Sequence, residues 1–246
     1  MPDEKYQPGE KYQLDQSTDT YHKVKARFCK KLLDELLPSL NAGDMVVEIG
    51  PGQGHFALAC QAKRMGYIGL EPSKVFREEL REKGINVKAA WVPPIPMEDE
   101  SCDLVYACTV LEHFPTYVEV SHFVNEVCRI LKNQKYFCVV VPNYLTVKSF
   151  FFDMDYSHSY VTTRTKLLRL FEHAGLQVVD IQHVIGFFWV RSHFFHHIIR
   201  HTINIVMVPI YWGFITWMFE YLGQGQLLWK IRKTLYEHII IIAKKT

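Results

Sequence analysis

Short apolar runs alternate with helical patterns from residue 45 to residue 141 of the chain. Parallel strands need a crossover connection, usually a helix, so this alternation predicts right-handed βαβ units and a parallel sheet. The strand-like runs are MVVEI (45–49), YIGL (67–70), INVKAA (85–90), DLVYAC (103–108) and YFCVVV (136–141).

Helical spacing of apolar residues predicts the elements that lie around and between these runs. A leading amphipathic helix is expected over 22–40, and others follow from about His55, over Ser73–Lys83, and over Tyr117–Leu131. After a loop, a helix ending at Gly175 precedes the strand LQVVDIQHV, and EHIIIIAKK (237–245) is the last strand. The sequence thus predicts seven strands, with a long insertion between the last two.

Length and charge limit the range of functions. The 246 residues suit one α/β domain, here residues 21–246, preceded by a polar and flexible arm, residues 1–20, that has no signal-peptide pattern. The net charge of +2 is much smaller than the excess of positive charge typical of proteins that bind duplex nucleic acid, which argues against a nucleic acid partner. Six cysteines without a CxxC pair indicate reduced thiols and a cytoplasmic protein.

A glycine-rich turn, VVEIGPGQG (46–54), leads from the first predicted strand into a helix. This layout brings a ligand against backbone and a helix N-terminus. A dinucleotide site would need GxGxxG, but Gly54 comes one residue early and His55 occupies the position of the third glycine. Glu71 ends the second strand, 21 residues after Gly50, where a carboxylate can accept both ribose hydroxyls of an adenosine.

With these motifs the chain resembles the class I S-adenosylmethionine methyltransferases, in particular the small-molecule and glycan enzymes similar to those of ubiquinone biosynthesis. The resemblance implies a Rossmann-like, seven-stranded, mostly parallel sheet with an antiparallel last strand, helices on both faces and a helical insertion at 187–236. It implies S-adenosylmethionine as the methyl donor. EIGPGQG, GLEPS and SCDLVYACTVLEHF match the family motifs, and they assign the donor to Glu48, Gly50, Gly52, Gly54, Glu71, Pro72, Cys108 and Thr109.

One position departs from the family pattern. An acidic residue commonly follows the third strand and holds the adenine amino group, but Trp91 stands there, next to Val92. We expect both residues to line the adenine, with Trp91 packing on the ring or marking a rearranged loop.

Transfer of a methyl group to a hydroxyl also requires that a proton be removed from the acceptor. The candidates at the carboxyl ends of the strands are Glu112, His113 and His158, and a histidine that titrates near neutrality suits a general base. Each could instead have a local structural role. Asp153 and Asp155 are expected either to orient His158 or to lie in solvent.

Residues 187–222 are more aromatic and aliphatic than a surface connection. Because the two final strands are expected to pair antiparallel, a single membrane crossing is excluded, and we predict a monotopic hairpin in one leaflet. A lid or a homodimer interface would bury the same side chains. The membrane reading places Tyr211, Trp212, Trp217 and Trp229 at headgroup depth and Arg191, Arg200, Lys230, Arg232 and Lys233 on lipid phosphate.

Four histidines of this insertion, His193, His196, His197 and His201, invite comparison with metal sites. No carboxylate or cysteine joins them nearby in the sequence, so no metal is predicted.

The expected reaction is O-methylation of a saccharide or lipid-linked acceptor by a peripheral membrane enzyme. The alternatives are methylation of a prenylated quinone precursor and a non-catalytic donor-binding partner subunit.

Overall fold

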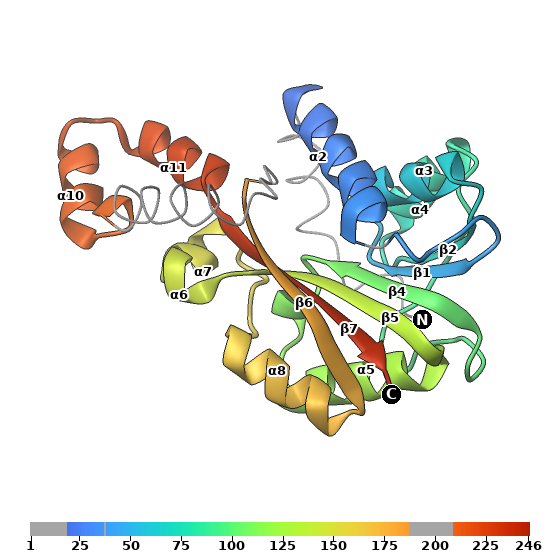
Figure 1. The fold of residues 1–246 in the computed structure, drawn as a ribbon. Helices are drawn as coiled ribbons and strands as arrows, with labels where there is room; N and C mark the ends of the chain where they lie inside the picture. Colours follow the sequence, from blue (N-terminus) through green and yellow to red (C-terminus); the bar gives the residue numbers. More distant parts are fainter. Residues whose placement is uncertain (1–18, 37, 187–208) are drawn as a thin grey trace.

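A computed structural model describes residues 19–36, 38–186 and 209–246, which contain a seven-stranded sheet flanked by helices (Figure 1). The strand order is β3-β2-β1-β4-β5-β7-β6; the first five strands pair in parallel, and β7 runs antiparallel to both neighbours. The predicted fold class is therefore confirmed. The strands are β1 Met45–Ile49, β2 Gly66–Leu70, β3 Val87–Lys88, β4 Cys102–Cys108, β5 Leu131–Pro142, β6 Leu176–Ile185 and β7 Glu237–Lys245.

The helices follow the predicted order, but the bounds of three elements shift. Strand β5 begins at Leu131, five residues before the predicted strand 136–141. The leading helix begins at Asp19, inside the expected arm, and the third strand shrinks from 85–90 to the two residues that pair with β2. The helices and turns are α2 Asp19–Lys31, η1 Leu32–Leu36, α3 His55–Ala62, α4 Lys74–Glu82, η2 Leu111–His113, α5 Tyr117–Ile130, α6 Tyr144–Val147, α7 Phe150–Met154, α8 Arg164–His173, α10 Gly213–Tyr221 and α11 Gly225–Thr234. The remainder of the predicted arm lies outside the described residues.

Two apolar cores lie on opposite faces of the sheet. Successive residues of a strand point to opposite faces, so Val46 packs with Phe28 of α2 and Phe56 of α3, whereas Val47 packs with Phe123 of α5. Figure 1 shows α2, α3 and α4 on one side of the sheet and α5 and α8 on the other. Burial of both faces explains why the strands read as continuous apolar runs.

The insertion leaves the sheet from the end of β6 and rejoins it at the start of β7, and these two points lie side by side. Ile185, the last residue of β6, pairs with Glu237, the first residue of β7. The antiparallel pairing expected for the final strands is thus confirmed. Among the described residues, no helix combines the length and the apolar character that a membrane crossing needs. The part of the predicted hairpin at 187–208 lies outside the described residues.

An aromatic cluster holds the described part of the insertion against α7. Tyr211 packs on Phe150, and its hydroxyl donates to the carbonyl oxygen of Arg232. The Arg232 side chain is itself buried, with the residue 7 % exposed, and donates to the carbonyl of Ile210 and the hydroxyl of Thr216. The prediction that Tyr211 and Arg232 face lipid is therefore wrong, because carbonyl and hydroxyl partners within the insertion satisfy the guanidinium.

Candidate functional site

The glycine loop after β1 has the backbone that the motif requires. Gly50, Gly52 and Gly54 all have positive φ, at 63°, 51° and 81°. A Cβ at Gly54 would lie 2.6 Å from a methyl group of Leu80, so this glycine permits close packing of the loop on α4. A Cβ at Gly52 would meet no described atom within 4 Å, so a ligand can approach the loop there.

Glu71 connects the end of β2 to this loop. Its buried carboxylate accepts hydrogen bonds from the backbone N–H of Gly52 at 3.1 Å and from that of Ser73 at 2.9 Å. Pro72 lies between Glu71 and Ser73, and the Ser73 hydroxyl caps the N-terminus of α4. The carboxylate is therefore fixed beside the glycine loop, where the ribose was predicted to lie.

Glu48 is buried near the carboxyl end of β1, an inner strand of the sheet. Burial raises its pKa to about 8, and a 2.6 Å hydrogen bond from the Tyr67 hydroxyl and the charge of Lys25 oppose this only in part. Tyr67 was not predicted as a site residue. In β2 it pairs with Val46, which lies two residues before Glu48 in β1 and therefore on the same face of the sheet.

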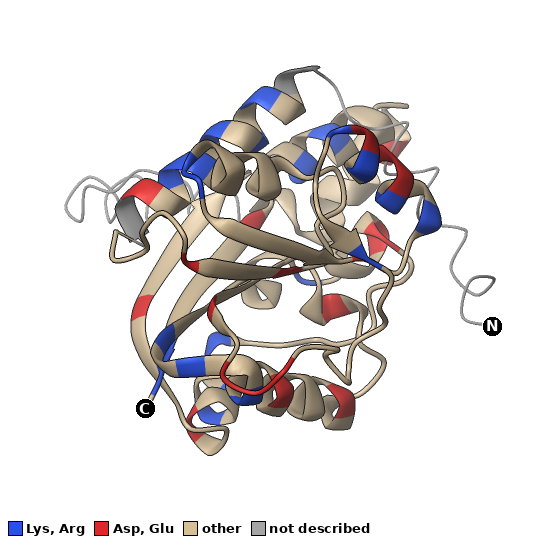
Figure 2. Ribbon diagram, turned by 90° about the vertical axis from the view of Figure 1, so that its right-hand side faces the viewer, with Lys and Arg blue, Asp and Glu red and all other residues tan. Residues whose placement is uncertain are grey.

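Helix α2 brings an unpredicted cation to the site. Lys25 Nζ donates to the sulfur of Cys108, the last residue of β4, at 3.1 Å. Basic residues recur along α2 (Figure 2), and Lys25 stands four residues before Cys29, which is buried. A cation at helical spacing with core residues is the signal that could have revealed it.

The segment after β4 lies against the glycine loop. A Cβ at Gly50 would be 3.1 Å from a methyl group of Val110. Thr109 adopts a positive φ of 54°, and its N–H donates to the carbonyl of Val140 in β5. Cys108 and Thr109 directly precede Val110, and their assignment to the donor stays a prediction.

Trp91 and Val92 follow β3 at the far edge of the sheet. The Trp91 side chain is 45 % exposed, whereas Val92 packs partly buried against the core. Their assignment to the adenine stays a prediction.

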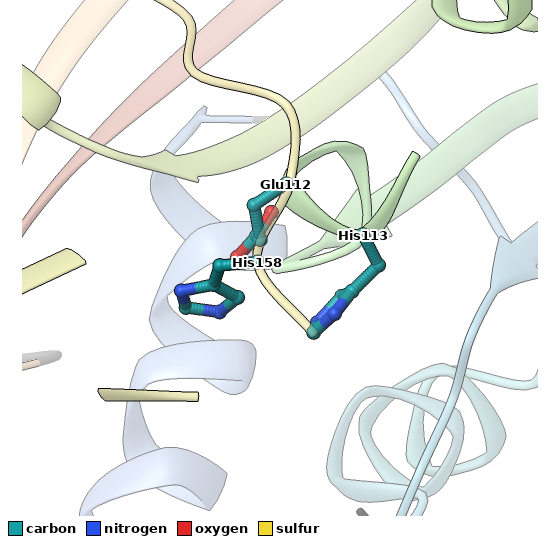
Figure 3. Close-up of side chains that lie close together, drawn as sticks. All are labelled: Glu112, His113 and His158. Carbon is teal, nitrogen blue, oxygen red and sulfur yellow. The ribbon is translucent and has the colours of Figure 1, made fainter. Parts of the chain in front are cut away.

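Glu112, His113 and His158 form a cluster at the end of β4 (Figure 3). One potential ligand atom from each residue lies within 4.8 Å of the others, and the two imidazole rings are 5.0 Å apart. The backbone N–H groups of Ser159 and Tyr160 donate to the carbonyl of Glu112, which ties the loop that carries His158 to η2. The structure therefore brings together all three predicted catalytic residues.

Each histidine of the cluster is oriented through Nδ1. His158 Nδ1 lies 2.6 Å from the carbonyl oxygen of Phe151, and since a carbonyl only accepts, this nitrogen carries the proton. His113 Nδ1 lies 2.8 Å from the Ser157 hydroxyl, which itself donates to Asp155. The Asp155 carboxylate thus supports His113 through Ser157, and the Asp155 backbone carbonyl accepts from the N–H of His158. The sequence had left open whether Asp155 orients His158 or lies in solvent. In both neutral rings Nε2 keeps its lone pair.

Burial keeps the cluster uncharged near neutrality. It raises the pKa of Glu112 to about 8, and together with the neighbouring His158 it lowers the pKa of His113 to about 4. Burial also lowers the pKa of His158. Glu112 is only 2 % exposed, and neither carboxylate oxygen accepts a hydrogen bond from another described residue.

The chain is similar in sequence to a known family of enzymes. A profile of the methyltransferase domain matches residues 21–181, more than half of the chain. The chain belongs to the methyltransferase domain family. Among curated proteins, a probable S-adenosylmethionine-dependent methyltransferase of Mycobacterium tuberculosis is 30% identical to this methyltransferase domain over 113 residues, which are 45% of the chain and 40% of the relative. One from Mycolicibacterium smegmatis is 28% identical over 142 residues, 56% of the chain and 54% of the relative.

Solved structures show the same fold as this methyltransferase domain. An S-adenosylmethionine-dependent methyltransferase from Archaeoglobus fulgidus superposes with a TM-score of 0.61 at 19% identity, over 92% of this chain and 94% of that one. A geranyl diphosphate methyltransferase in complex with S-adenosylmethionine gives 0.62 at 17% identity, over 92% and 87%.

The family implies S-adenosylmethionine as the donor, and the residues fit it. The space above Gly52 is open, Glu71 is a fixed carboxylate next to it, and Glu48 and Lys25 place a carboxyl group and an ammonium group near the carboxyl ends of β1 and β4.

Proposed function

We propose that this protein transfers a methyl group from S-adenosylmethionine to a hydroxyl oxygen of a saccharide or lipid-linked acceptor at a membrane surface. The observation that carries the proposal is the cluster of Glu112, His113 and His158 directly after β4, in the same segment as Val110, which lies against Gly50 of the glycine loop. A donor loop beside a buried proton acceptor is what O-methylation needs.

Five residues would hold the donor. The glycine loop at Gly50 and Gly52 would lie beneath it, and Glu71 would accept the ribose hydroxyls. Glu48 and Lys25 would face the amino and carboxylate groups of its methionine part, respectively. When bound, the donor supplies a methyl group on a positively charged sulfur, and the protein has to align the acceptor oxygen with that carbon and exclude water.

The cluster would take the acceptor proton. His158 Nε2 has a free lone pair because Nδ1 donates to the Phe151 carbonyl, and burial keeps the ring neutral. His113 is held in the same tautomer by Ser157, but its lower pKa makes it the weaker base. Glu112, with a pKa of about 8, is itself protonated at neutral pH, so the proton would go to His158 and not to this carboxyl group.

Helix α10 supports the membrane part of the proposal. Phe214, Trp217 and Tyr221 are 64 %, 59 % and 79 % exposed and lie on one side of the helix. Their rings lie close to one another, 5.9 Å and 5.8 Å between successive centroids. Aromatic side chains gathered in this way are typical of a helix that lies in the interface of a bilayer.

The same features leave room for other functions. A prenylated quinone precursor would also be reached from a membrane surface. A catalytically silent subunit that binds the donor would need the glycine loop and Glu71 but not the cluster. The exposed face of α10 would equally serve a homodimer or a lid.

Incubation with labelled donor separates these possibilities. Purified protein is mixed with labelled S-adenosylmethionine and separate glycan, lipid and quinone extracts, and base-stable label in the glycan or lipid fraction is expected. Label confined to quinones would favour the alternative acceptor. No label in any extract, together with tight donor binding, would favour the silent subunit.

A further inference from the structure

We propose that Glu112, His113 and His158 form a binding site for one divalent transition-metal cation. Each residue places one potential ligand atom within 4.8 Å of the other two, on two segments 45 residues apart that β4 and the loop after α7 bring together (Figure 3). Two imidazoles and one carboxylate on one side of a cation leave further positions open, as in catalytic metal sites.

Glu112 gives the first independent reason. It is 2 % exposed, and neither of its oxygens accepts a hydrogen bond from another residue in the described parts of the chain. A carboxylate withdrawn from water normally has a charged or hydrogen-bonding partner. A cation between this group and the two histidines would supply one.

The surroundings of the histidines give the second reason. Metal-binding histidines commonly donate from their other ring nitrogen to a carbonyl or a carboxylate, which fixes the tautomer and orients the ring. His158 donates from Nδ1 to the Phe151 carbonyl, and His113 donates to Ser157, which donates to Asp155. In both rings Nε2 therefore keeps the lone pair with which it could bind a metal.

The ligand types select the class of cation. Magnesium and calcium prefer oxygen ligands, whereas two imidazoles favour zinc, manganese, iron or cobalt. The open positions would bind the acceptor hydroxyl and lower its pKa. Its proton would pass to water, the oxygen would form a bond to the methyl carbon, and the carbon–sulfur bond would break with its electrons on sulfur. With a cation bound, the histidines would be ligands, and this route would replace the proton transfer to His158 described above for the metal-free cluster.

This catalytic role rests on the methyl transfer proposed above, whereas cation binding is measured without donor or acceptor. The full chain is stripped with chelator and titrated with Mn²⁺, Zn²⁺ and Co²⁺ by calorimetry, and Co²⁺ binding is followed by its visible absorption. His193, His197 and His201 could bind metal at their sequence spacing, so the titrations are repeated in a background with all three changed to Gln.

One cation per chain is expected in both backgrounds. Glu112→Gln, His113→Ala and His158→Ala should each weaken binding at least 100-fold, and Ser157→Ala about 10-fold because it only orients His113. His122→Ala, an exposed histidine on α5, is the matched control and should change nothing. Glu112→Gln keeps the volume of the side chain, so the variant remains informative if the alanine variants unfold.

The proposal is overturned if the stripped protein in the glutamine background binds none of the three cations more tightly than about 1 mM. It is equally overturned if binding survives in Glu112→Gln and both histidine variants. Binding of the demethylated donor, S-adenosylhomocysteine, is titrated in parallel without metal. Its loss would count against the proposed function and not against the cation site.

Discussion

Lys25 in α2 and Cys108 at the end of β4 are joined by a 3.1 Å hydrogen bond from the ammonium group to the sulfur, across 83 positions of sequence. This contact brings a cation to the edge of the sheet where Glu48 provides a carboxyl group and where its charge lowers the pKa of Glu48 against the effect of burial. The methionine part of the donor carries an ammonium and a carboxylate group, so Glu48 would accept a hydrogen bond from the first and Lys25 would donate to the second.

Lys25→Met is therefore expected to weaken binding of S-adenosylhomocysteine by about 10-fold or more, since a charge-assisted hydrogen bond contributes about 1.5 to 3 kcal/mol. Methylthioadenosine, which lacks the amino acid part, should bind both proteins equally. Lys30→Met, an exposed lysine of the same helix, is the control. Equal losses for both ligands would mean that Lys25 supports the fold of α2 and does not contact the donor.

The glycine loop offers a second test with a matched control. Gly52 and Gly84 both have positive φ, 51° and 70°, and a Cβ at either would meet no described atom within 4 Å. Alanine at each should cost a similar ~1 kcal/mol of stability. Only Gly52→Ala should weaken donor binding in calorimetry, by at least 10-fold, because only Gly52 lies beside Glu71. Similar donor affinities in the two variants would remove the loop from the donor site.

Glu71 has two roles that Glu71→Gln separates. The side chain holds Gly52 and Ser73 by accepting from their N–H groups, and it would accept the ribose hydroxyls. A glutamine keeps one acceptor oxygen, so folding should persist while adenosine-containing ligands bind about 10-fold more weakly. Retention of full affinity for S-adenosylhomocysteine would show that the ribose lies elsewhere.

How much of this site could be predicted depends on where its determinants lie in the sequence. The glycine loop and Glu71 were found because strand, turn and helix are adjacent in sequence and fix their own geometry. Lys25, Tyr67 and Ser157 were missed as site residues because each acts through a partner that only the tertiary fold supplies. Arg232 was wrongly predicted to face lipid phosphate. A basic residue close to aromatic residues in the sequence is typical of a membrane interface, and only the tertiary structure shows that its guanidinium donates to the carbonyl of Ile210.

Asp103 tests the stability of the sheet away from the site. Its carboxylate accepts hydrogen bonds from Lys132 at 2.7 Å and from the Met45 N–H at 2.9 Å, joining β4 to β5 and β1. Burial opposes ionisation, but these bonds and Lys135 keep the pKa of Asp103 below its ordinary value of 3.8. The stabilisation is therefore fully present above pH 3.8 and is lost as the pH falls through the lower, folded value.

Asp103→Asn should lower the free energy of unfolding by about 1 to 3 kcal/mol at pH 7, measured in urea. The difference from wild type should shrink as the pH falls below 3.8. Asp99→Asn removes an exposed ion pair with Arg129 and should cost less than about 1 kcal/mol. A pH-independent effect of Asp103→Asn would mean that its hydrogen bonds, and not its charge, stabilise the sheet.

The exposed face of α10 makes the membrane proposal testable. Phe214, Trp217 and Tyr221 would gain about 25 cal/mol per Å² on entering the bilayer interface, and exposed basic residues such as Lys230 would add about 1 kcal/mol each near anionic lipid. Binding should thus have an apolar part that resists salt and a charged part that salt weakens. Co-sedimentation with vesicles of phosphatidylcholine and phosphatidylserine measures both.

Changing Phe214, Trp217 and Tyr221 together to Ser should abolish co-sedimentation at high salt, while the melting temperature stays near that of wild type because none of the three is buried. Tyr117→Ser with Val118→Ser, on the exposed side of α5, is the control and should leave binding unchanged. If wild type fails to bind vesicles at low salt but forms a dimer that the triple variant loses, α10 is a contact between two copies of the chain. A lipid-borne acceptor would then lose its main support, and methylation of a small saccharide would be the form of the proposed function to pursue.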